Sequence, residues 1–406
     1  MIIDAHAYCF EPIDQPAGHA NGAEHLRWVQ AAHAAHHQPA WRVRDRAPAR
    51  SDVLAPQGRT DLSRLPDVNF RADPARGRVV WTVDGQDYTK QFFPPNLRDV
   101  AFTPHSLVAE MDYAGVDVAL LHTDPMLGRD SAYQAWCVRQ YPDRLRSMAP
   151  VDEWRLGHET DAVITELERA IHQHGLHAIK FIPPFAYLNG PQPWDDGAYR
   201  PFWQAATALG VPVFFTLGAG PGELACKLSP AEQRQGYLDE LGILTRWMTR
   251  YPDVPCGLTH GFPWRLFLKG ERIVLPEAIW TPFENPNCHL EVSFPVRLGD
   301  RFDYPYREVW PTLAEMIARI GAARLFWGTD MPFQNRFCTY RQSRDWLERY
   351  TLLDKRELAQ LMSGTAARLL GIDTTNTIDT IDAINTIERT SGQDTDTRRC
   401  RKAGKV

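Results

Sequence analysis

The chain begins with the strand-like stretch Ile2-Ile3-Asp4-Ala5-His6-Ala7-Tyr8, and its last apolar run reads Leu325-Phe326-Trp327-Gly328-Thr329-Asp330-Met331-Pro332. Each stretch places a polar side chain at the end of a short apolar run. Alternate residues of a strand point to the same side, so we expect Asp4, His6 and Tyr8 to share one face. The two stretches predict the first and last strands of one sheet, with functional groups at the strand ends.

Short apolar runs alternate with helix-length stretches between residues 104 and 372. Counting the strand at 2–5, we expect eight strands, the others lying at 117–122, 144–151, 176–182, 211–217, 257–261, 289–294 and 324–328. This alternation predicts a parallel sheet with crossover helices. Eight strands favour a (β/α)8 TIM barrel over an open doubly wound sheet.

A long insertion separates the first strand from the first barrel helix. The expected barrel comprises residues 1–10 and 101–372, and the insertion spans 11–100. The insertion contains a predicted helix at 23–37 and a hairpin, 78–83 and 86–92, turned by Asp84-Gly85. Because it follows a barrel strand, we expect it to cap the active site, although a purely stabilising appendage is the alternative. Residues 373–406 repeat Asp, Thr, Asn and Ile without amphipathic order and are expected to form a disordered tail.

Composition excludes several partners. The formal net charge of −5 argues against nucleic acid or an anionic membrane as the main partner. No apolar run approaches the roughly 18 residues of a membrane span, and the N-terminus lacks the basic start of a signal peptide. The seven cysteines form no Cys-x-x-Cys pair, which is typical of reduced thiols. We therefore expect a cytoplasmic protein that acts on a small molecule.

These motifs resemble the amidohydrolase-related family. The matching residues are His6, His260 in Leu258-Thr259-His260-Gly261, and Asp330 in Gly328-Thr329-Asp330-Met331-Pro332. The order and spacing resemble the branch that contains aminocarboxymuconate-semialdehyde decarboxylase and the resorcylate-type decarboxylases. The resemblance covers residues 1–10 and 104–372. It implies an eight-stranded barrel with one divalent ion, zinc or manganese, and no organic cofactor. It also implies a strand-six histidine near the substrate and, by analogy alone, a possible homodimer.

The chain departs from the family pattern at two metal ligands. Tyr8 stands where the second strand-one histidine is expected, and Thr216 stands where a strand-five histidine is expected. His6 and Asp330 remain, and His260 would complete a set of two histidines and one carboxylate, which suits zinc or ferrous iron. Tyr8 as a phenolate, or Glu291, are further candidate ligands. Because the superfamily includes metal-independent pyrone-dicarboxylate lactonases, a metal-free site remains open.

The same residues make a candidate acid–base site without a metal. His260 beside Asp330 would act as a general base. Tyr8 would donate a hydrogen bond to a developing oxyanion. Lys180 would hold a substrate carboxylate or act as an acid. Aromatic and guanidinium side chains near the strand ends suit a planar ring that bears a carboxylate. The candidate substrate-binding residues are His122, Thr216, Phe262, Trp264, Glu291, Arg297, Phe333 and Arg336.

Three functions follow from this site. The first is non-oxidative decarboxylation of a small aromatic or enoic carboxylic acid, with Asp330 or His260 protonating the vacated carbon. The second is hydrolysis of a lactone, amide or cyclic ester, which need not require a metal. The third is a pseudoenzyme that binds a small acid. An arginine-lined, dry pocket would favour decarboxylation, whereas an ordered water against Asp330 in an open mouth would favour hydrolysis.

Overall fold

Eight parallel strands form the centre of the protein. The computed structural model describes residues 1–225 and 228–373. The sheet order is β1-β7-β8-β9-β10-β11-β14-β15, so each strand pairs with its neighbours along the chain, as in successive βαβ units. The strand bounds are β1 Ile3–Ala7, β7 Val118–Leu121, β8 Leu145–Ala149, β9 Ala178–Phe181, β10 Val213–Phe215, β11 Cys256–Leu258, β14 Cys288–Val292 and β15 Leu325–Trp327.

The sheet closes where the segment after β15 meets β1. Met331 forms a parallel bridge with Ala7, and the Tyr8 amide donates to the Met331 carbonyl over 2.8 Å. The Asp330 amide donates to the His6 carbonyl at the same distance, 2.8 Å. The predicted (β/α)8 barrel is therefore confirmed, and its two end motifs lie side by side.

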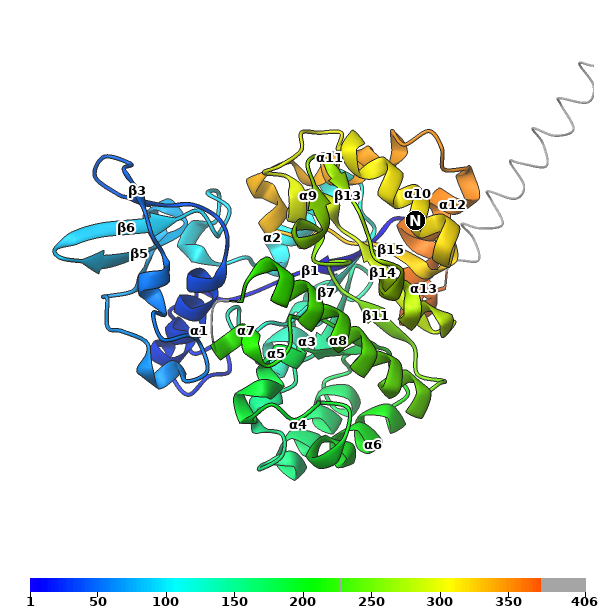
Figure 1. Ribbon diagram of the computed structural model, residues 1–406, viewed down its shortest axis with the longest axis horizontal. Coiled ribbons are helices and arrows are strands. Elements are labelled where there is room, and N and C mark those ends of the chain that lie inside the picture. Colours follow the sequence, from blue (N-terminus) through cyan, green and yellow to red (C-terminus); the bar gives the residue numbers. More distant parts are fainter. Residues whose placement is uncertain (226–227, 374–406) are drawn as a thin grey trace, which may run out of the picture.

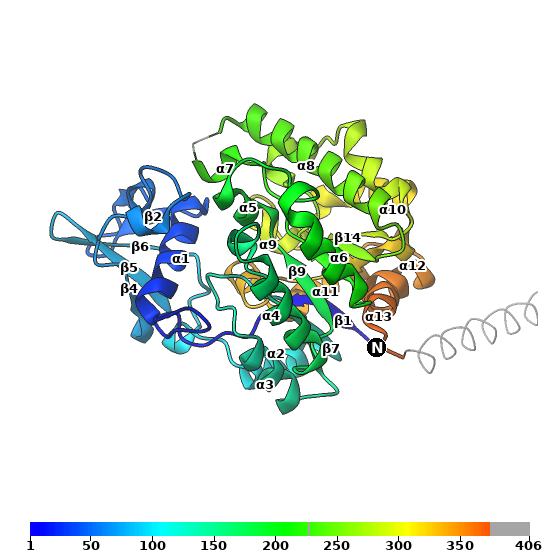
Figure 2. The same ribbon diagram turned by 90° about the horizontal axis from the view of Figure 1, so that it is seen from below.

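Helices cover the outside of the barrel (Figures 1 and 2). These helices are α2 Pro104–Ala114, α3 Ser131–Gln140, α4 Thr160–His172, α6 Arg200–Ala208, α8 Pro230–Arg250, α10 Trp310–Ile320 and α11 Tyr340–Glu348, followed by the shorter α12 Lys355–Ala359 and α13 Thr365–Leu370. Three short helices lie in the loops that follow strands: α5 Pro183–Ala186, α7 Gly222–Ala225 and α9 Phe294–Leu298. A small hairpin, β12 Leu268–Lys269 and β13 Arg272–Ile273, follows β11.

Local sequence sets the helix limits. The Thr103 side chain accepts the Ser106 amide at the start of α2, and Pro104 occupies the first turn, where no amide is needed. Gly115 ends the same helix at φ +69°, a left-handed conformation that glycine adopts without strain. Ser229 and Glu232 form a reciprocal capping box at the start of α8. These signals place the helices where the hydrophobic pattern predicts them.

The insertion forms a lobe beside the barrel, with α1 Gly22–Ala35 next to α7 (Figures 1 and 2). A five-stranded antiparallel sheet in the order β3-β2-β6-β5-β4 completes this lobe. Its strands are β2 Ala40–Arg42, β3 Pro48–Ala49, β4 Arg71–Asp73, β5 Arg78–Val83 and β6 Gln86–Lys90. The predicted helix and the hairpin turned by Asp84-Gly85 are both present.

Apolar side chains fill the barrel interior towards the amino-terminal ends of the strands. This cluster consists of Ile3, Ala5, Val118, Leu120, Met148, Ala178, Phe214 and Phe326, covered by Ala366, Ala367 and Leu369 of α13. The polar interior therefore lies towards the carboxyl ends of the strands, where barrel enzymes place their chemistry. Apart from Asp373, the predicted tail 373–406 lies outside the described residues. In the described part of the chain, no helix has the length and apolar character needed to cross a membrane.

Candidate functional site

An irregularity in β1 separates Asp4 from His6. The strand register against β7 shifts between Asp4 and Ala7, and such bulges re-aim side chains near functional sites. Asp4 accepts the Thr329 amide over 3.1 Å and the Tyr340 hydroxyl over 2.6 Å, so it lies towards the outer helix α11. His6 and Tyr8 face the barrel interior. The expectation that Asp4 shares their face is wrong because strict alternation fails at this bulge.

His6 is held from both ring nitrogens. Its Nδ1 lies 2.8 Å from Glu291 Oε2, and its Nε2 lies 2.9 Å from the Tyr8 hydroxyl and 3.3 Å from Asp330 Oδ1. A carboxylate only accepts, so Nδ1 carries the proton and Nε2 presents its lone pair to Tyr8 and Asp330. The His122 ring stacks on His6 with 3.6 Å between ring centroids. The strand-one histidine is thus fixed in one tautomer and one orientation.

His260 and Asp330 each follow a strand in a left-handed backbone conformation. Their φ angles are +64° and +62°, which non-glycine residues rarely adopt and which often mark functional sites. The His260 amide donates to Glu291 Oε2 over 2.7 Å, so one carboxylate positions both histidines. At Gly328 a Cβ atom would lie 2.7 Å from Glu291 Oε1, and this close approach requires a residue without a side chain.

Lys180 of β9 extends this network across the barrel. Its Nζ donates to His122 Nδ1 over 3.0 Å and to Thr259 Oγ1 over 3.4 Å. His122 Nε2 donates to the Ala5 carbonyl over 2.8 Å, so its Nδ1 is free to accept from lysine. Thr259 Oγ1 lies 2.6 Å from Thr216 Oγ1. A chain of polar contacts therefore runs from the buried lysine to Thr216.

Burial dominates the electrostatics of this cluster. Burial raises the pKa of Asp330 to about 8, although the charges of Arg336 and Arg297 oppose the rise. Burial lowers the pKa of His6 and of His260 well below the usual range, and neighbouring cationic groups add to both effects. Burial also lowers the pKa of Lys180. Without a bound cation, the site at neutral pH therefore combines neutral imidazoles with a carboxyl group that retains its proton.

His6, His260 and Asp330 form a group able to hold a metal ion. One ligand atom from each lies within 4.8 Å of the other two. His260 Nδ1 is buried without a hydrogen-bond partner among the described residues. Two imidazoles and a carboxylate are an acceptable donor set for zinc, iron or manganese. The Glu291 contact to His6 Nδ1 matches the outer carboxylate that commonly orients a metal-binding histidine. These residues fit a divalent cation.

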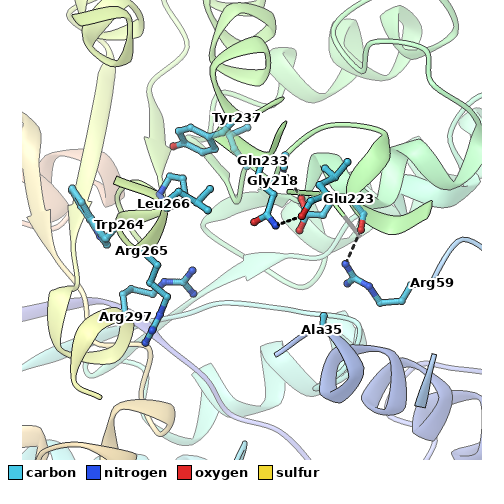
Figure 3. A pocket seen from close by; sticks show the side chains of 14 residues that line it. Ala35, Arg59, Gly218, Glu223, Gln233, Tyr237, Trp264, Arg265, Leu266 and Arg297 are labelled. Atoms are coloured by element: carbon cyan, nitrogen blue, oxygen red, sulfur yellow. Dashed lines mark hydrogen bonds between the residues drawn. The ribbon is translucent and has the colours of Figure 1, made fainter. Parts of the chain in front are cut away.

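Two adjoining cavities open beside the cluster. The inner one has a volume of about 250 Å³ and is lined by His260, Thr216 and Phe262. The outer one has a volume of about 590 Å³ and is lined by Trp264 and Arg265. Both are lined by Arg59, Glu223, Tyr237 and Arg297. Figure 3 shows the outer cavity, with Arg265 and Arg297 on one side and Arg59 and Ala35 of the insertion on the other.

The predicted substrate-binding residues fall into two groups. Thr216, Phe262, Trp264 and Arg297 line the cavities. The other four do not line these two cavities: His122 and Glu291 lie inside the polar cluster, Phe333 packs against Tyr8, and Arg336 contacts the insertion. Arg336 lines a separate groove beside α2.

Several cavity residues were not predicted from the sequence, among them Thr259, Tyr237 and Arg59. Thr259 directly precedes His260 in the motif Leu258-Thr259-His260-Gly261, and this position next to a predicted site residue could have identified it. Tyr237 lies on α8 among other buried side chains, and nothing in the helical pattern distinguishes it. Arg59 belongs to the insertion, where its amide donates to the Leu224 carbonyl over 2.7 Å. No motif surrounds Arg59, and only the three-dimensional contact with α7 brings it to the cavity.

Comparisons with known proteins identify the family. A search of curated proteins gave no match. The structure is similar to a putative 2-pyrone-4,6-dicarboxylic acid hydrolase from Pseudomonas putida, with TM-score 0.51, 17% identity, and coverage of 69% of this chain and 90% of the other. It is also similar to 2,6-dihydroxybenzoate decarboxylase from Rhizobium (TM-score 0.48, 19% identity, coverage 66% and 88%). A third similar structure is 5-carboxyvanillate decarboxylase from Sphingomonas paucimobilis (TM-score 0.47, 18% identity, coverage 66% and 82%).

These identities are low, and the Pseudomonas putida structure supports the shared fold alone. The family model described as Amidohydrolase matches residues 35–372, which is most of the chain. This match agrees with the barrel, with the intact strand-eight aspartate and with the cluster of His6, His260 and Asp330. The protein is therefore an enzyme of the amidohydrolase family.

Proposed function

We propose that the protein catalyses the non-oxidative decarboxylation of a small aromatic or enoic carboxylic acid. The observation that carries this proposal is Arg297, which lines both cavities beside the polar cluster. Among the described residues, its guanidinium has no hydrogen bond or ion pair. A half-buried arginine without a partner is suited to bind a carboxylate in two parallel hydrogen bonds.

The cavity walls match the rest of such a substrate. Phe185 and Phe262 line the inner cavity, and aromatic faces stack favourably on planar rings. The inner volume of about 250 Å³ accommodates a single substituted ring rather than a large ligand. The arginine lining supports decarboxylation, because the reaction needs a group that binds the substrate carboxylate.

Asp330 is the proposed proton donor. Its side chain is 12% exposed and lies 3.3 Å from His6 Nε2, so it is buried but still reachable. In the reaction the bond between the ring carbon and the carboxylate breaks, and its electron pair stays on the carbon. The Asp330 proton transfers to that carbon, and carbon dioxide leaves. Solvent then reprotonates the Asp330 carboxylate.

His6, His260 and Asp330 would hold a divalent cation at this site. When bound, the cation would polarise a substrate oxygen as a Lewis acid. The protein's own contribution is orientation: Glu291 fixes His6 and the His260 backbone, and Arg297 supplies the positive charge for the carboxylate. Zinc and manganese remain the proposed ions.

The test is carbon dioxide release from a panel of hydroxybenzoates and dienoic acids. In deuterated water, the product should carry deuterium at the vacated carbon. Asp330→Asn should lower turnover by about 10²–10⁴-fold, and Arg297→Gln should raise KM more than Arg297→Lys does. Arg319→Gln, which removes an exposed pair with Glu277, is the control. No carbon dioxide from any acid would contradict the proposal.

Hydrolysis of a lactone or cyclic ester is the second candidate. One observation favours it: His260 Nδ1 is buried and unpartnered among the described residues, and the depressed pKa of His260 keeps the imidazole neutral. A neutral imidazole beside the cavity can accept a proton from water. Ring opening of a lactone panel, with no decarboxylation of any acid, would replace the first proposal with this one.

We further propose that the insertion caps the cavities. Ala35 and Arg59 of the insertion line the outer cavity, which supports this role over a purely stabilising one. The five described cysteines, Cys9, Cys137, Cys256, Cys288 and Cys338, are free and buried, which supports the proposed cytoplasmic location. The homodimer stays a prediction. Retention of His6, His260 and Asp330 in one cluster argues against a pseudoenzyme.

A further inference from the structure

One distance around His6 has the size expected within a metal site. Tetrahedral coordination with bonds of about 2.0–2.2 Å separates neighbouring donor atoms by roughly 3.3–3.6 Å. His6 Nε2 and Asp330 Oδ1 are 3.3 Å apart. His6 Nε2 presents a lone pair in this direction because its Nδ1 proton is bound to Glu291. The pair already has the spacing of two ligands on one ion.

Tyr8 brings a fourth donor atom to the same point. Its hydroxyl oxygen lies 2.9 Å from His6 Nε2, and the charge of the Asp330 carboxylate acts on it directly. Tyr8 is only 5% exposed, and its ring packs edge-on against Phe333 at 5.8 Å. The phenol is therefore held against the two candidate ligands and is not oriented towards solvent.

The charge around Tyr8 suits a phenolate once a cation is present. A divalent ion is the largest local charge in such a site and deprotonates its ligands. The positive charge of Arg297 also acts on the Tyr8 oxygen.

We infer that the Tyr8 oxygen is the fourth ligand of a divalent cation site with His6 Nε2, a His260 ring nitrogen and Asp330 Oδ1. Tyr8 thus replaces a nitrogen ligand with an oxygen ligand. Oxygen donors suit manganese and ferrous iron better than additional imidazoles do, so the site should shift in preference from zinc towards these harder ions. This inference concerns binding and stands independently of the reaction proposed above.

The experiment is a metal titration of the full-length chain after dialysis against a chelator. Zinc has no absorbance of its own, so the ultraviolet difference spectrum reports ionised tyrosine directly. Cobalt, measured in parallel, reports ligand type through its visible spectrum. Three variants are compared with the unmodified chain: Tyr8→Phe, Tyr8→His and Tyr237→Phe. Tyr237 is a matched control because it is a buried tyrosine of the cavity wall. Circular dichroism establishes that each variant folds.

The expected result is one zinc per chain with the absorbance of one tyrosinate. Tyr8→Phe should lose that absorbance and bind zinc more weakly by at least the roughly 10–100-fold typical of losing an outer contact to a ligand. Tyr8→His should lose the absorbance but retain affinity, with an altered cobalt spectrum. Tyr237→Phe should match the unmodified chain.

Three results would overturn the inference. The first is metal binding without tyrosinate absorbance, with equal affinity in Tyr8→Phe. The second is binding by Tyr8→His or Tyr8→Phe but not by the unmodified chain, which would mean that the phenol blocks the site. The third is no binding by any of the four proteins.

Discussion

The polar cluster at the barrel centre and the contacts between insertion and barrel are built differently. In the cluster, His6, Glu291 and Asp330 come from or directly follow strands, and their backbones are fixed by the sheet. The insertion meets the barrel through loop backbone, as in the Arg59 amide bond to the Leu224 carbonyl, and through long side chains, such as Arg336 donating to the Phe92 carbonyl over 3.1 Å. The difference teaches that strand geometry positions the polar cluster, whereas the proposed role of the insertion in access and binding depends on how it docks on the barrel.

The largest expected effect comes from Lys180→Met. This change removes the donor to His122 Nδ1 and a positive charge that stabilises ionised Asp330 and Glu291. We expect kcat/KM to fall by about 10²–10⁴-fold, the range for lost acid–base catalysis. Steady-state kinetics on a substrate from the panel measures this.

The insertion supplies a matched control in Lys90, which is also buried and donates to the His33 carbonyl over 2.6 Å. Lys90→Met should reduce stability but leave turnover per folded molecule nearly unchanged. Equal kinetic losses in the two variants would break the contrast between cluster and insertion.

Asp4→Asn should reduce turnover by up to about 10²-fold, the loss that a misplacement of about 1 Å produces. Asp4 does not reach the cavities. It joins β1 to the Thr329 and Tyr340 hydroxyls and so holds the Asp330 segment in its left-handed conformation. Tyr340→Phe, which removes only one of these hydrogen bonds, should lower turnover less than Asp4→Asn does.

Separate measurement of kcat and KM tests this positioning role. The loss should lie in kcat because the group moved is the proposed proton donor, not the carboxylate-binding arginine. A change confined to KM, or to stability alone, would contradict a role of Asp4 in positioning Asp330.

Carboxyl groups of the barrel and of the insertion should respond oppositely to pH. Burial raises the pKa of Glu153 from 4.5 to about 8, and its Oε1 accepts the Ile182 amide over 2.6 Å. Between these pH values the folded chain binds a proton that the unfolded chain has lost. Its stabilising contribution is therefore full below pH 4.5 and declines by about 1.4 kcal/mol per pH unit up to about pH 8.

Urea denaturation across this range measures the free energy of unfolding. As pH rises, this free energy should increase for Glu153→Gln relative to the unmodified chain, and the difference should level off above about pH 8. Asp87 in the insertion is the opposite case, because the Thr82 hydroxyl and Arg71 lower its pKa. It stabilises above its ordinary pKa, and this contribution is lost as pH falls through the lowered value. The free energy of unfolding of Asp87→Asn should therefore be lower than that of the unmodified chain above the ordinary pKa of aspartate, and equal to it below the lowered pKa of Asp87. The same slope for both variants would contradict the assignment of burial as the cause.

The barrel and its central residues were accessible from the sequence because both depend on local patterns. Alternating strand and helix signals predict eight strands, and the His6, His260 and Asp330 motifs lie at strand ends. Their proximity follows from the fold alone, since the carboxyl ends of parallel strands meet at one face. Tyr8 was identified for the same reason.

The remaining site residues depend on contacts that no local pattern encodes. The bulge in β1 turns Asp4 away from His6, and one shifted residue cannot be read from alternation. Arg297 was predicted to follow a strand, but the short helix α9 that carries it was not. Arg59 reaches the cavity only through the docking of the insertion on α7. Long-range docking of loops therefore limits sequence-based prediction of the cavity wall.

The smallest expected effect comes from Arg336→Gln, which tests the insertion contact directly. The Arg336 guanidinium bonds the Phe92 carbonyl and lies 3.2 Å from His36 Nε2, both in the insertion. Losing one or two such bonds costs about 0.5–1.5 kcal/mol each, so KM should rise roughly 2- to 10-fold with little change in kcat. Its charge also favours ionised Asp330, so the pKa of Asp330, measured from the pH profile of kcat/KM, should rise slightly. Arg98→Gln, at an exposed position of the insertion, is the control. A fall in kcat comparable to that of Lys180→Met would place Arg336 in the cluster and remove the distinction between the two regions.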